Sequence, residues 1–374
     1  MKILLPRPAG DGVKKILIID DSAIVRKQLR EIFEQAGYSV AIARNGRDGL
    51  VQAERVMPDL VTLDVNMPEM GGLECLQALL EKRPLPVIMV SSLMTEGAEA
   101  ALSALDLGAV DILCKPDGSH SRNMAAVTAE LLAKVEAALL ARVSPRRRSR
   151  PKPARPDRTI GEAPPGPRPR SPARSNFPVV LIGSSTGGPR CLQEILEHLP
   201  TDFPAAVIVA QHMPATFTKV FARRLAKEVA IPVMETQQRT ELAPGHCYIG
   251  RGDADCVVSR SGGRHFIAPV PPREGALWRP SVDRMVESAL ANIPSERLFG
   301  TLLTGMGWDG AEAFSQLRGR NRPVIAESET SCVVFGMPRR LIERGGASAI
   351  LDSSEIGPAI IDLVAPVTAH GAQR

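Results

Sequence analysis

The sequence is poor in aromatic residues and has no long apolar run. Phe, Trp and Tyr make up 3% of the 374 residues. No stretch approaches the roughly 18–20 apolar residues that a membrane-spanning helix needs. The N-terminal stretch MKILLPRPAGDG is too short and too interrupted for a secretory signal peptide, and residues 1–12 are predicted to be a tail. Neither a membrane-embedded nor a secreted protein is expected.

The six cysteines form neither a C-x-x-C pair nor a metal-ligand spacing. They are scattered between Cys75 and Cys332, and several lie in apolar runs, where a free thiol packs as a small hydrophobic group. This pattern argues against a zinc site and against a disulfide framework, and it favours a reducing, cytoplasmic setting. The composition is 44% apolar and 23% charged, which is typical of a globular protein, and the length allows two domains.

Positive charge is concentrated in one segment. The formal net charge is +5, yet residues 144–176 contain nine Arg and one Lys against Asp157 and Glu162, a local charge of 10 − 2 = +8. The same segment has nine prolines and almost no large apolar residues. It is therefore predicted to be an interdomain linker, extended by proline and by repulsion among its arginines. Binding of the PRRRSRP stretch in a DNA minor groove is the less common meaning of such a composition.

On both sides of this segment, β-branched runs alternate with amphipathic helical patterns. Over residues 13–143, five such runs from KILIID to DILCKP predict a (βα)₅ domain whose parallel sheet is covered by helices on both faces. Over residues 177–374, the runs PVVLIG, AAVIVA and FGTLLT predict a second, doubly wound parallel α/β domain.

The strand ends of the first domain carry carboxylates, a hydroxyl and a lysine. These residues lie where parallel sheets bind their ligands: Asp20, Asp21, Asp64, Ser91 and Lys115. Three converging carboxylates raise one another's pKa unless a divalent cation neutralises them, so the cluster favours a Mg²⁺ site. An aspartate after a strand is often only a helix N-cap. Five suitable residues together argue against that explanation.

In the second domain, two adjacent serines lie on a glycine-rich turn. Residues 183–187, GSSTG, fit G-x-S-x-G between a strand and a helix. This is the setting of a nucleophilic serine, but also of a phosphate-binding turn. The G-x-G-x-x-G spacing of dinucleotide sites is missing, and the next strand ends in Gln211-His212 rather than in an acidic residue. That difference favours a catalytic base over a ribose contact.

A serine becomes nucleophilic when an imidazole accepts its proton and a carboxylate orients that imidazole. Of the six histidines, only His212 directly follows a buried-type strand, and Asp309 follows another strand on a glycine-rich turn. Either residue alone would more commonly be a solvated or capping group. Together with Ser185 they form the expected catalytic set.

The stretches ILIIDDS, LDVNMPEMGG, MVSS and KP resemble those of response-regulator receiver domains. The resemblance implies that Asp64 accepts a phosphoryl group, while Ser91 and Lys115 contact the phosphoryl oxygens. It implies the Mg²⁺ ligands Asp20, Asp21, Asp64 and, through its backbone carbonyl, Asn66. Receivers usually place an aromatic switch residue three positions before the lysine, and this chain has Ile112 there.

Longer stretches resemble the chemotaxis protein-glutamate methylesterase family, CheB. They are IGSSTGGP, QHMPATFTKVFARRL, RPSVDRMVESAL, LTGMGWDGA and CVVFGMP, in the order receiver, linker, catalytic domain. The resemblance implies Ser185 as nucleophile, His212 as general base and Asp309 as its orienting partner. It also implies that the backbone at Thr186 and Met306 borders the oxyanion. The order Ser, His, Asp along the chain differs from that of α/β-hydrolases.

The same resemblance implies a serine hydrolase that demethylates glutamate methyl esters and deamidates glutamines of chemoreceptors, activated when its receiver is phosphorylated. Its partners would be methylated chemoreceptors and a CheA-type histidine kinase, with no DNA contact and no membrane insertion. Mg²⁺ is expected in the receiver and no cofactor in the catalytic domain. The alternative from another class is a non-enzymatic regulator with a degenerate second domain. The three intact catalytic residue types argue against it.

Overall fold

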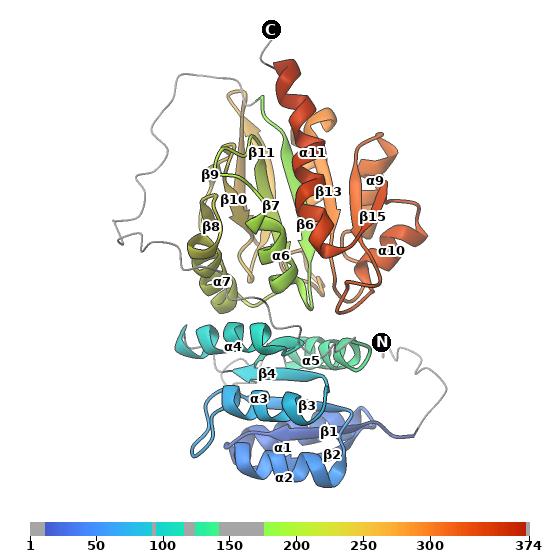
Figure 1. The fold of residues 1–374 in the computed structure, drawn as a ribbon. Coiled ribbons are helices and arrows are strands. Elements are labelled where there is room, and N and C mark those ends of the chain that lie inside the picture. Colours follow the sequence, from blue (N-terminus) through green and yellow to red (C-terminus); the bar gives the residue numbers. More distant parts are fainter. Residues whose placement is uncertain (1–11, 92–94, 116–123, 142–175, 372–374) are drawn as a thin grey trace.

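The computed structural model describes residues 12–91, 95–115, 124–141 and 176–371. The elements of the first domain are β1 Lys15–Ile19, α1 Ala23–Gln35, β2 Ser39–Ala43, α2 Gly46–Val56, β3 Leu60–Asp64, α3 Gly72–Lys82, β4 Val87–Ser91, α4 Thr95–Leu107, β5 Asp111–Cys114 and α5 Met124–Leu139. The five strands are parallel and ordered β2-β1-β3-β4-β5. The predicted (βα)₅ domain is confirmed (Figure 1).

Apolar side chains alternate between the two faces of the first sheet. On β1, Ile16 and Ile18 enter the core that contains Leu29 of α1, whereas Leu17 and Ile19 enter the core on the other face. A strand with helices on both sides is apolar on both faces, which explains the buried run ILII after the exposed first residue of β1. The candidate site residues lie at or just beyond the carboxyl ends of the strands.

The second domain is built on a larger parallel sheet. Its strands and helices are β6 Val179–Ser184, α6 Gly188–Glu197, β7 Ala206–Gln211, α7 Ala215–Glu228, β8 Val233–Glu235, β9 Thr240–Glu241, β10 Cys247–Ile249, β11 Asp255–Ser261, β12 Arg264–Val270, α8 Val282–Asn292, the 3₁₀ turn η2 Ser295–Arg297, β13 Leu298–Leu302, α9 Ala311–Gly319, β14 Val324–Glu327, α10 Met337–Glu343, β15 Ala349–Leu351 and α11 Ser353–Gly371. Seven strands are ordered β15-β14-β13-β6-β7-β10-β8, and all pairs are parallel. The doubly wound prediction is confirmed.

Helices cover both faces of this sheet. Val180 and Ile182 of β6 pack in the core that includes residues of α6, α7 and α11, whereas Val179 and Leu181 pack with residues of α8, α9 and α10. The central position of β6 between β13 and β7 matters for function. The loops that follow these three strands leave the sheet side by side at one edge.

A small antiparallel sheet was not predicted. β11 and β12 form a hairpin, and β9 adds to β12. The hairpin turn is Gly262-Gly263, whose φ angles of 56° and 78° suit glycine and match the tight turns of antiparallel hairpins. β11 also packs against α8, so the hairpin supports the helix that begins at the candidate active site.

The receiver lies against the catalytic domain on the side of α4 and α5 (Figure 1). α4 packs on α7, and Arg224 of α7 forms an ion pair with Asp106 at the end of α4. Thr186, the residue after Ser185, donates a hydrogen bond to Asp111 of β5. The turn that holds Ser185 is therefore in direct contact with the receiver.

The predicted tail and linker lie outside the described residues, apart from Gly12 and Asn176. The domain boundaries at 13–143 and 177–374 therefore stay predictions. No described helix combines the length and the apolar character that crossing a bilayer requires.

Candidate active site and phosphoacceptor site

The second sheet brings His212 and Asp309 into contact. His212 directly follows β7, and Asp309 lies in the loop between β13 and α9. His212 Nε2 is 2.9 Å from Asp309 Oδ2, and the two residues are only 6% and 4% exposed. A carboxylate can only accept hydrogen bonds, so the neutral imidazole carries its proton on Nε2 and its lone pair on Nδ1.

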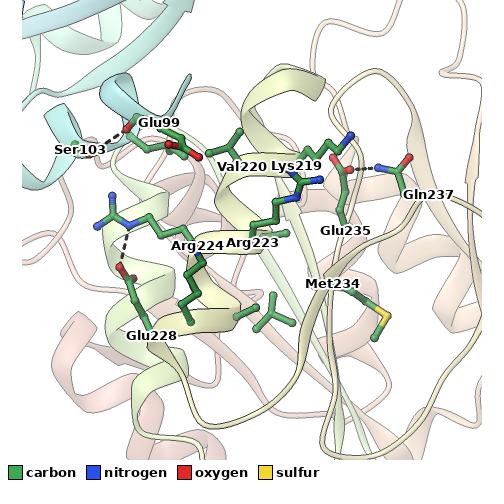
Figure 2. Close-up of a pocket in the computed structure, with 15 residues that line it drawn as sticks. Glu99, Ser103, Lys219, Val220, Arg223, Arg224, Glu228, Met234, Glu235 and Gln237 are labelled. Atoms are coloured by element: carbon green, nitrogen blue, oxygen red, sulfur yellow. Dashed lines mark hydrogen bonds and ion pairs between the residues drawn. The ribbon is translucent and has the colours of Figure 1, made fainter. Parts of the chain in front are cut away.

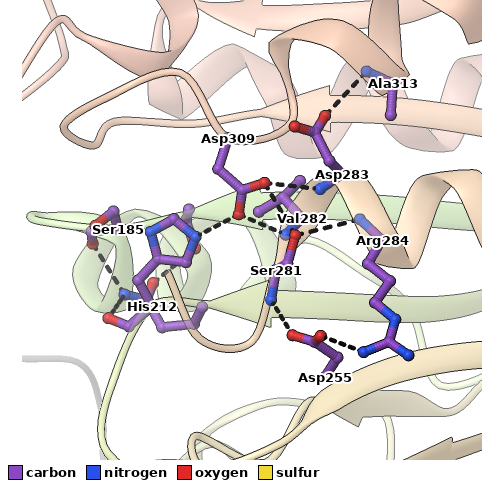
Figure 3. A network of polar contacts seen from close by, with 11 residues as sticks. Ser185, His212, Asp255, Ser281, Val282, Asp283, Arg284, Asp309 and Ala313 are labelled. Carbon is purple, nitrogen blue, oxygen red and sulfur yellow. Dashed lines mark hydrogen bonds and ion pairs between the residues drawn. The ribbon is translucent and has the colours of Figure 1, made fainter. Parts of the chain in front are cut away.

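The N-terminus of α8 holds the Asp309 carboxylate (Figure 3). Oδ2 accepts from the backbone N–H of Val282 at 2.7 Å, and Oδ1 accepts from the N–H of Asp283 at 2.9 Å and from Ser281 Oγ at 3.1 Å. Burial on its own would raise the pKa of Asp309. The hydrogen bond and charge of His212, with these N–H donors, outweigh burial and lower that pKa. Asp309 therefore stays ionised beside the imidazole.

Ser185 stands on the turn between β6 and α6, and the His212 ring lies between Ser185 and Asp309 (Figure 3). Ser185 is 4% exposed, and its backbone N–H donates to the Thr304 carbonyl at 3.0 Å. Within the described part of the chain, neither Ser185 Oγ nor the buried His212 Nδ1 makes a hydrogen bond. In apo structures such catalytic contacts are often long, and they shorten when substrate binds.

The neighbouring Ser184 is engaged elsewhere. Ser184 is fully buried, and its Oγ donates to Gln211 Oε1 at 2.6 Å. Gln211 Nε2 in turn donates to the carbonyls of Ser185 and His212, at 2.9 and 3.1 Å. The buried Gln211 amide therefore connects the end of β6, which precedes Ser185, to the end of β7, which precedes His212. In the sequence, Gln211 stands out only as the residue before His212, and no local pattern indicates this role.

Two backbone N–H groups lie next to Ser185. The N–H groups of Thr186 and Met306 donate no hydrogen bond to any described residue. A Cβ built on Gly305 would lie 2.6 Å from the Ser185 Cβ, so the segment before Met306 passes directly beside the nucleophile. Free N–H donors at such a place can stabilise an oxyanion.

Trp278 covers one face of the His212 imidazole. Its ring stacks on His212 with a centroid distance of 5.3 Å and an interplanar angle of 7°. Trp278 lies in the loop before α8, far along the chain from His212, so no local sequence pattern pointed to the contact. The one available signal was its position three residues before Ser281, the helix N-cap.

A second carboxyl group adjoins the site. Asp283 Oδ1 accepts from the N–H of Ala313 in α9, while the Asp283 backbone N–H donates to Asp309. Burial, followed by the nearby Asp309 charge, raises the pKa of Asp283 to about 7. The two helices α8 and α9 thereby cap each other through Asp309 and Asp283.

The first domain gathers the acidic residues that the sequence predicted. Ligand oxygens of Asp20, Asp21 and Asp64 all lie within 4.8 Å of one another. Lys115 Nζ forms ion pairs with Asp64 Oδ2 at 2.6 Å and with Asp20 Oδ2 at 3.0 Å. Three carboxylates with hard oxygen donors and one exposed member, Asp21, fit Mg²⁺.

Asp64 is an unusual carboxyl group. Burial, supported by the charge of Asp20, raises its pKa to about 6, although Lys115 works in the opposite direction. Ser91 is fully buried at the end of β4, the strand next to β3. The Asn66 backbone N–H donates to Asp64 Oδ1 at 3.3 Å. The structure thus brings all the predicted phosphoacceptor residues to one edge of the sheet.

Comparison with known proteins adds an independent line of evidence. Residues 180–360 match the CheB methylesterase family, and residues 16–126 match the response regulator receiver domain family. A protein-glutamate methylesterase/protein-glutamine glutaminase of Rhodospirillum rubrum is 48% identical over 351 residues, which cover 91% of this chain and 94% of the relative. A second, from Carboxydothermus hydrogenoformans, is 43% identical over 356 residues, with coverages of 94% and 99%. The solved catalytic domain of Thermotoga maritima CheB methylesterase is 38% identical, covers 50% of this chain and 99% of that chain, and superposes with a TM-score of 0.49.

Proposed function

Because the chain belongs to the CheB family of receiver-bearing protein-glutamate methylesterases and protein-glutamine glutaminases, we propose that Ser185, His212 and Asp309 are its catalytic triad. The enzyme demethylates glutamate methyl esters of chemoreceptors and deamidates glutamines. The observation that carries the assignment is the contact between His212 Nε2 and Asp309 Oδ2 at 2.9 Å, which leaves Nδ1 as the basic atom on the Ser185 side.

In the acylation half-reaction, Ser185 Oγ attacks the γ-carbonyl carbon of the methylated glutamate and His212 Nδ1 takes the Oγ proton. The carbonyl π electrons move onto oxygen, where the N–H groups of Thr186 and Met306 stabilise the negative charge. The intermediate collapses as its bond to the methoxy oxygen breaks. The imidazolium returns its proton to that oxygen, and methanol leaves.

In the deacylation half-reaction, a water molecule takes the place of Ser185 as the attacking group, and the same steps follow. His212 accepts a proton from water, the hydroxide oxygen adds to the acyl carbon, and Ser185 Oγ leaves with the proton from the imidazolium. The products are a glutamate carboxyl group and the regenerated serine. A glutamine substrate differs only in the leaving group, which is ammonia, so one triad serves both reactions.

Asp309 contributes by fixing the imidazole and by stabilising its protonated form. Its carboxylate is itself fixed by the N–H groups that open α8, so it cannot rotate away when the ring becomes charged. Trp278 stacks on one face of the His212 ring and so restricts movement of the imidazole perpendicular to its plane.

The two buried histidines of the catalytic domain provide a matched test. His212→Gln is expected to lower methanol release from methylated receptor membranes by about 10³-fold or more, because no other group can take the serine proton. His265→Gln serves as the control: this histidine is equally buried but is bound to the Asn292 carbonyl, away from the triad. Its activity should stay within about threefold. Comparable losses in both folded variants would contradict the assignment of His212.

We further propose that the receiver regulates the triad. A histidine kinase of the chemotaxis pathway would phosphorylate Asp64, with Asp20 and Asp21 holding Mg²⁺, which neutralises phosphoryl charge when bound. Lys115 would move from its ion pairs with Asp20 and Asp64 to the phosphoryl oxygens, and Ser91 would donate to them. The chemistry of the donor set supports this role.

The contact between Thr186 and Asp111 supports a blocking mechanism. It places the receiver one residue from the nucleophile, where a protein substrate must approach. Phosphorylation would favour an arrangement in which this contact is broken. The partners in this scheme are methylated chemoreceptors and the kinase.

A further inference from the structure

The outer face of α7 carries a row of basic side chains. Lys219, Arg223 and Lys227 follow one another at intervals of four residues, so they lie on one face of the helix, about 6 Å apart along its axis. All three side chains are exposed. None forms an ion pair with another residue in the part of the chain that the structure describes. We call these three residues the α7 basic row.

A row of like charges at this spacing destabilises a helix, whereas opposite charges stabilise it. The same helix shows the favourable arrangement one position away, where Arg224 pairs with Glu228 at 3.0 Å. Glu235 accepts hydrogen bonds from Thr218 and Gln237, and the charge of Lys219 also acts on it. One carboxylate beside three cations leaves most of the charge of the row uncompensated within the described residues, so this charge is available to another molecule.

The row borders a groove between the two domains (Figure 2). The groove has a volume of about 960 Å³. Its floor includes Val220 and Met234, and its opposite wall is the receiver helix α4 with Glu99 and Ser103. An apolar floor with a basic edge suits an extended surface of a protein better than it suits a small, fully charged anion.

The groove lies at the same end of the catalytic domain as the triad. Receiver residues Asp106 and Asp111 lie close together in the chain, and they contact Arg224 of α7 and Thr186 of the nucleophile turn respectively. α7 itself begins three residues after His212. A protein that reaches Ser185 therefore passes beside the α7 basic row.

We propose that the α7 basic row is the docking surface for the glutamate-rich surface of the receptor substrate. The proposal rests on the proposed function: the substrate carries glutamate side chains, and each demethylation adds one more carboxylate to the same surface. The chain's own residues 144–176 do not fit the row, because their charge of +8 is of the same sign. Docking by charge would hold the receptor while successive esters reach the cleft.

The test removes the charges and keeps the helix. Lys219→Gln, Arg223→Gln and Lys227→Gln are combined in the full chain, since glutamine is a good helix former. The substrate is a soluble, methylated cytoplasmic fragment of a chemoreceptor, assayed with acetyl phosphate and Mg²⁺. We expect KM to rise about tenfold with kcat within twofold, and the dependence of KM on salt to become weaker.

A matched control removes three exposed arginines elsewhere. Arg47→Gln and Arg55→Gln on α2, with Arg260→Gln on β11, change the net charge by the same amount. KM of this variant should stay within twofold of the original. An equal rise of KM in both triple variants would mean that only total charge matters, and would overturn the proposal, as would an unchanged KM in the α7 variant.

A small uncharged substrate separates this proposal from the catalytic assignment. The γ-methyl ester of N-acetylglutamate amide should be hydrolysed equally by the original chain and by both triple variants. A chain that hydrolyses neither substrate would contradict the proposed function itself. If the α7 variant loses binding to vesicles containing phosphatidylglycerol while KM for the soluble fragment is unchanged, the row binds lipid and the docking proposal is wrong.

Discussion

Ser184 and Ser185 are neighbours in the chain but lie in different environments. Ser184 belongs to β6, is fully buried and is committed to Gln211, whereas Ser185 is the first residue beyond the strand and lies beside His212. On a sharp turn between strand and helix, successive side chains point in different directions. This difference supports the proposal that Ser185, and not Ser184, is the nucleophile.

Ser185→Ala is expected to lower turnover by about 10⁴- to 10⁶-fold, as when other triad nucleophiles are removed. Ser184→Ala should cost less than about tenfold, the size of one lost neutral hydrogen bond. Methanol release by both variants, with circular dichroism to establish folding, gives the comparison. An inactive Ser184→Ala beside an active Ser185→Ala would reverse the assignment.

Asp64 links the phosphoacceptor site to pH. Its pKa is raised from 3.8 to about 6, so the folded chain binds this proton more tightly than the unfolded chain does. Without metal, the free energy of unfolding should therefore decrease as pH rises through that interval. Because a protonated carboxyl is a poor ligand, Mg²⁺ affinity should fall about tenfold per pH unit below about 6.

Calorimetric titration with Mg²⁺ between about pH 5 and pH 8 measures this dependence. Asp64→Asn should bind Mg²⁺ more weakly and with a flatter pH profile, since the titrating ligand is gone. If Asp64→Asn retained the full pH dependence, another group of the cluster would be responsible.

At the scale of elements, the turn between β6 and α6 depends on two glycines. Gly187 has a φ of 81°, a conformation that favours glycine. Gly188 has an ordinary φ, but a Cβ at this position would lie 2.2 Å from Gln211 Oε1 and 2.8 Å from Ser184 Cβ. The second glycine is thus required by close packing against the amide that connects the two strand ends.

Gly188→Ala is accordingly expected to displace Gln211 and with it the Ser185 and His212 carbonyls. We expect kcat to fall at least about tenfold and stability to fall by about 1–3 kcal/mol, the usual cost of overpacking. Gly319→Ala is the control, because it lies in helix α9 with no atom within 4 Å of a new Cβ. That variant should be as active and slightly more stable. A fully active Gly188→Ala would show that the Gln211 amide does not position the triad.

The elements that sequence predicted best are the buried parallel strands and the side chains just beyond them. β6, β7 and β13 are mostly apolar, and their pattern predicts parallel strands whose following loops meet at one sheet edge. Ser185 and His212 directly follow their strands, and Asp309 lies in the loop after β13; the glycine-rich motif and the chemistry of a triad singled these residues out. The hairpin of β11 and β12 was not predicted, because its strands mix polar and apolar residues and form no long buried run. The contacts of Asp309 with Ser281 and Val282, and of His212 with Trp278, join loops distant in sequence, which no local pattern encodes.

At the scale of the whole molecule, the contact between the domains combines specific polar pairs with packing of α4 on α7. Within the described residues, the polar pairs are Asp106 with Arg224 and Asp111 with Thr186. Val333, which lies beside the turn after β6, packs against the receiver core. Asp111 is also held by Lys134 at 3.0 Å, which in turn contacts the Ile112 carbonyl at 2.8 Å. β5 contains Ile112 in place of the aromatic switch residue of other receivers. Through Asp111, this strand nevertheless contacts the turn that holds Ser185.

If the receiver blocks the cleft, weakening this contact should activate the enzyme without phosphate. Removal of residues 1 to 143 exposes a domain with its own sheet and core, and it should be more active than the unphosphorylated full chain. Asp106→Asn removes only one partly exposed ion pair, worth about 0–1 kcal/mol, so it should raise unphosphorylated activity by no more than about fivefold. Both are measured as methanol release without phosphodonor. Asp253→Asn is the control for loss of an exposed carboxylate, which pairs with the nearby Arg251 and lies outside the contact between the domains. A truncated domain that folds but is no faster than the intact chain would contradict blocking, because nothing would then have been removed from the path of the substrate.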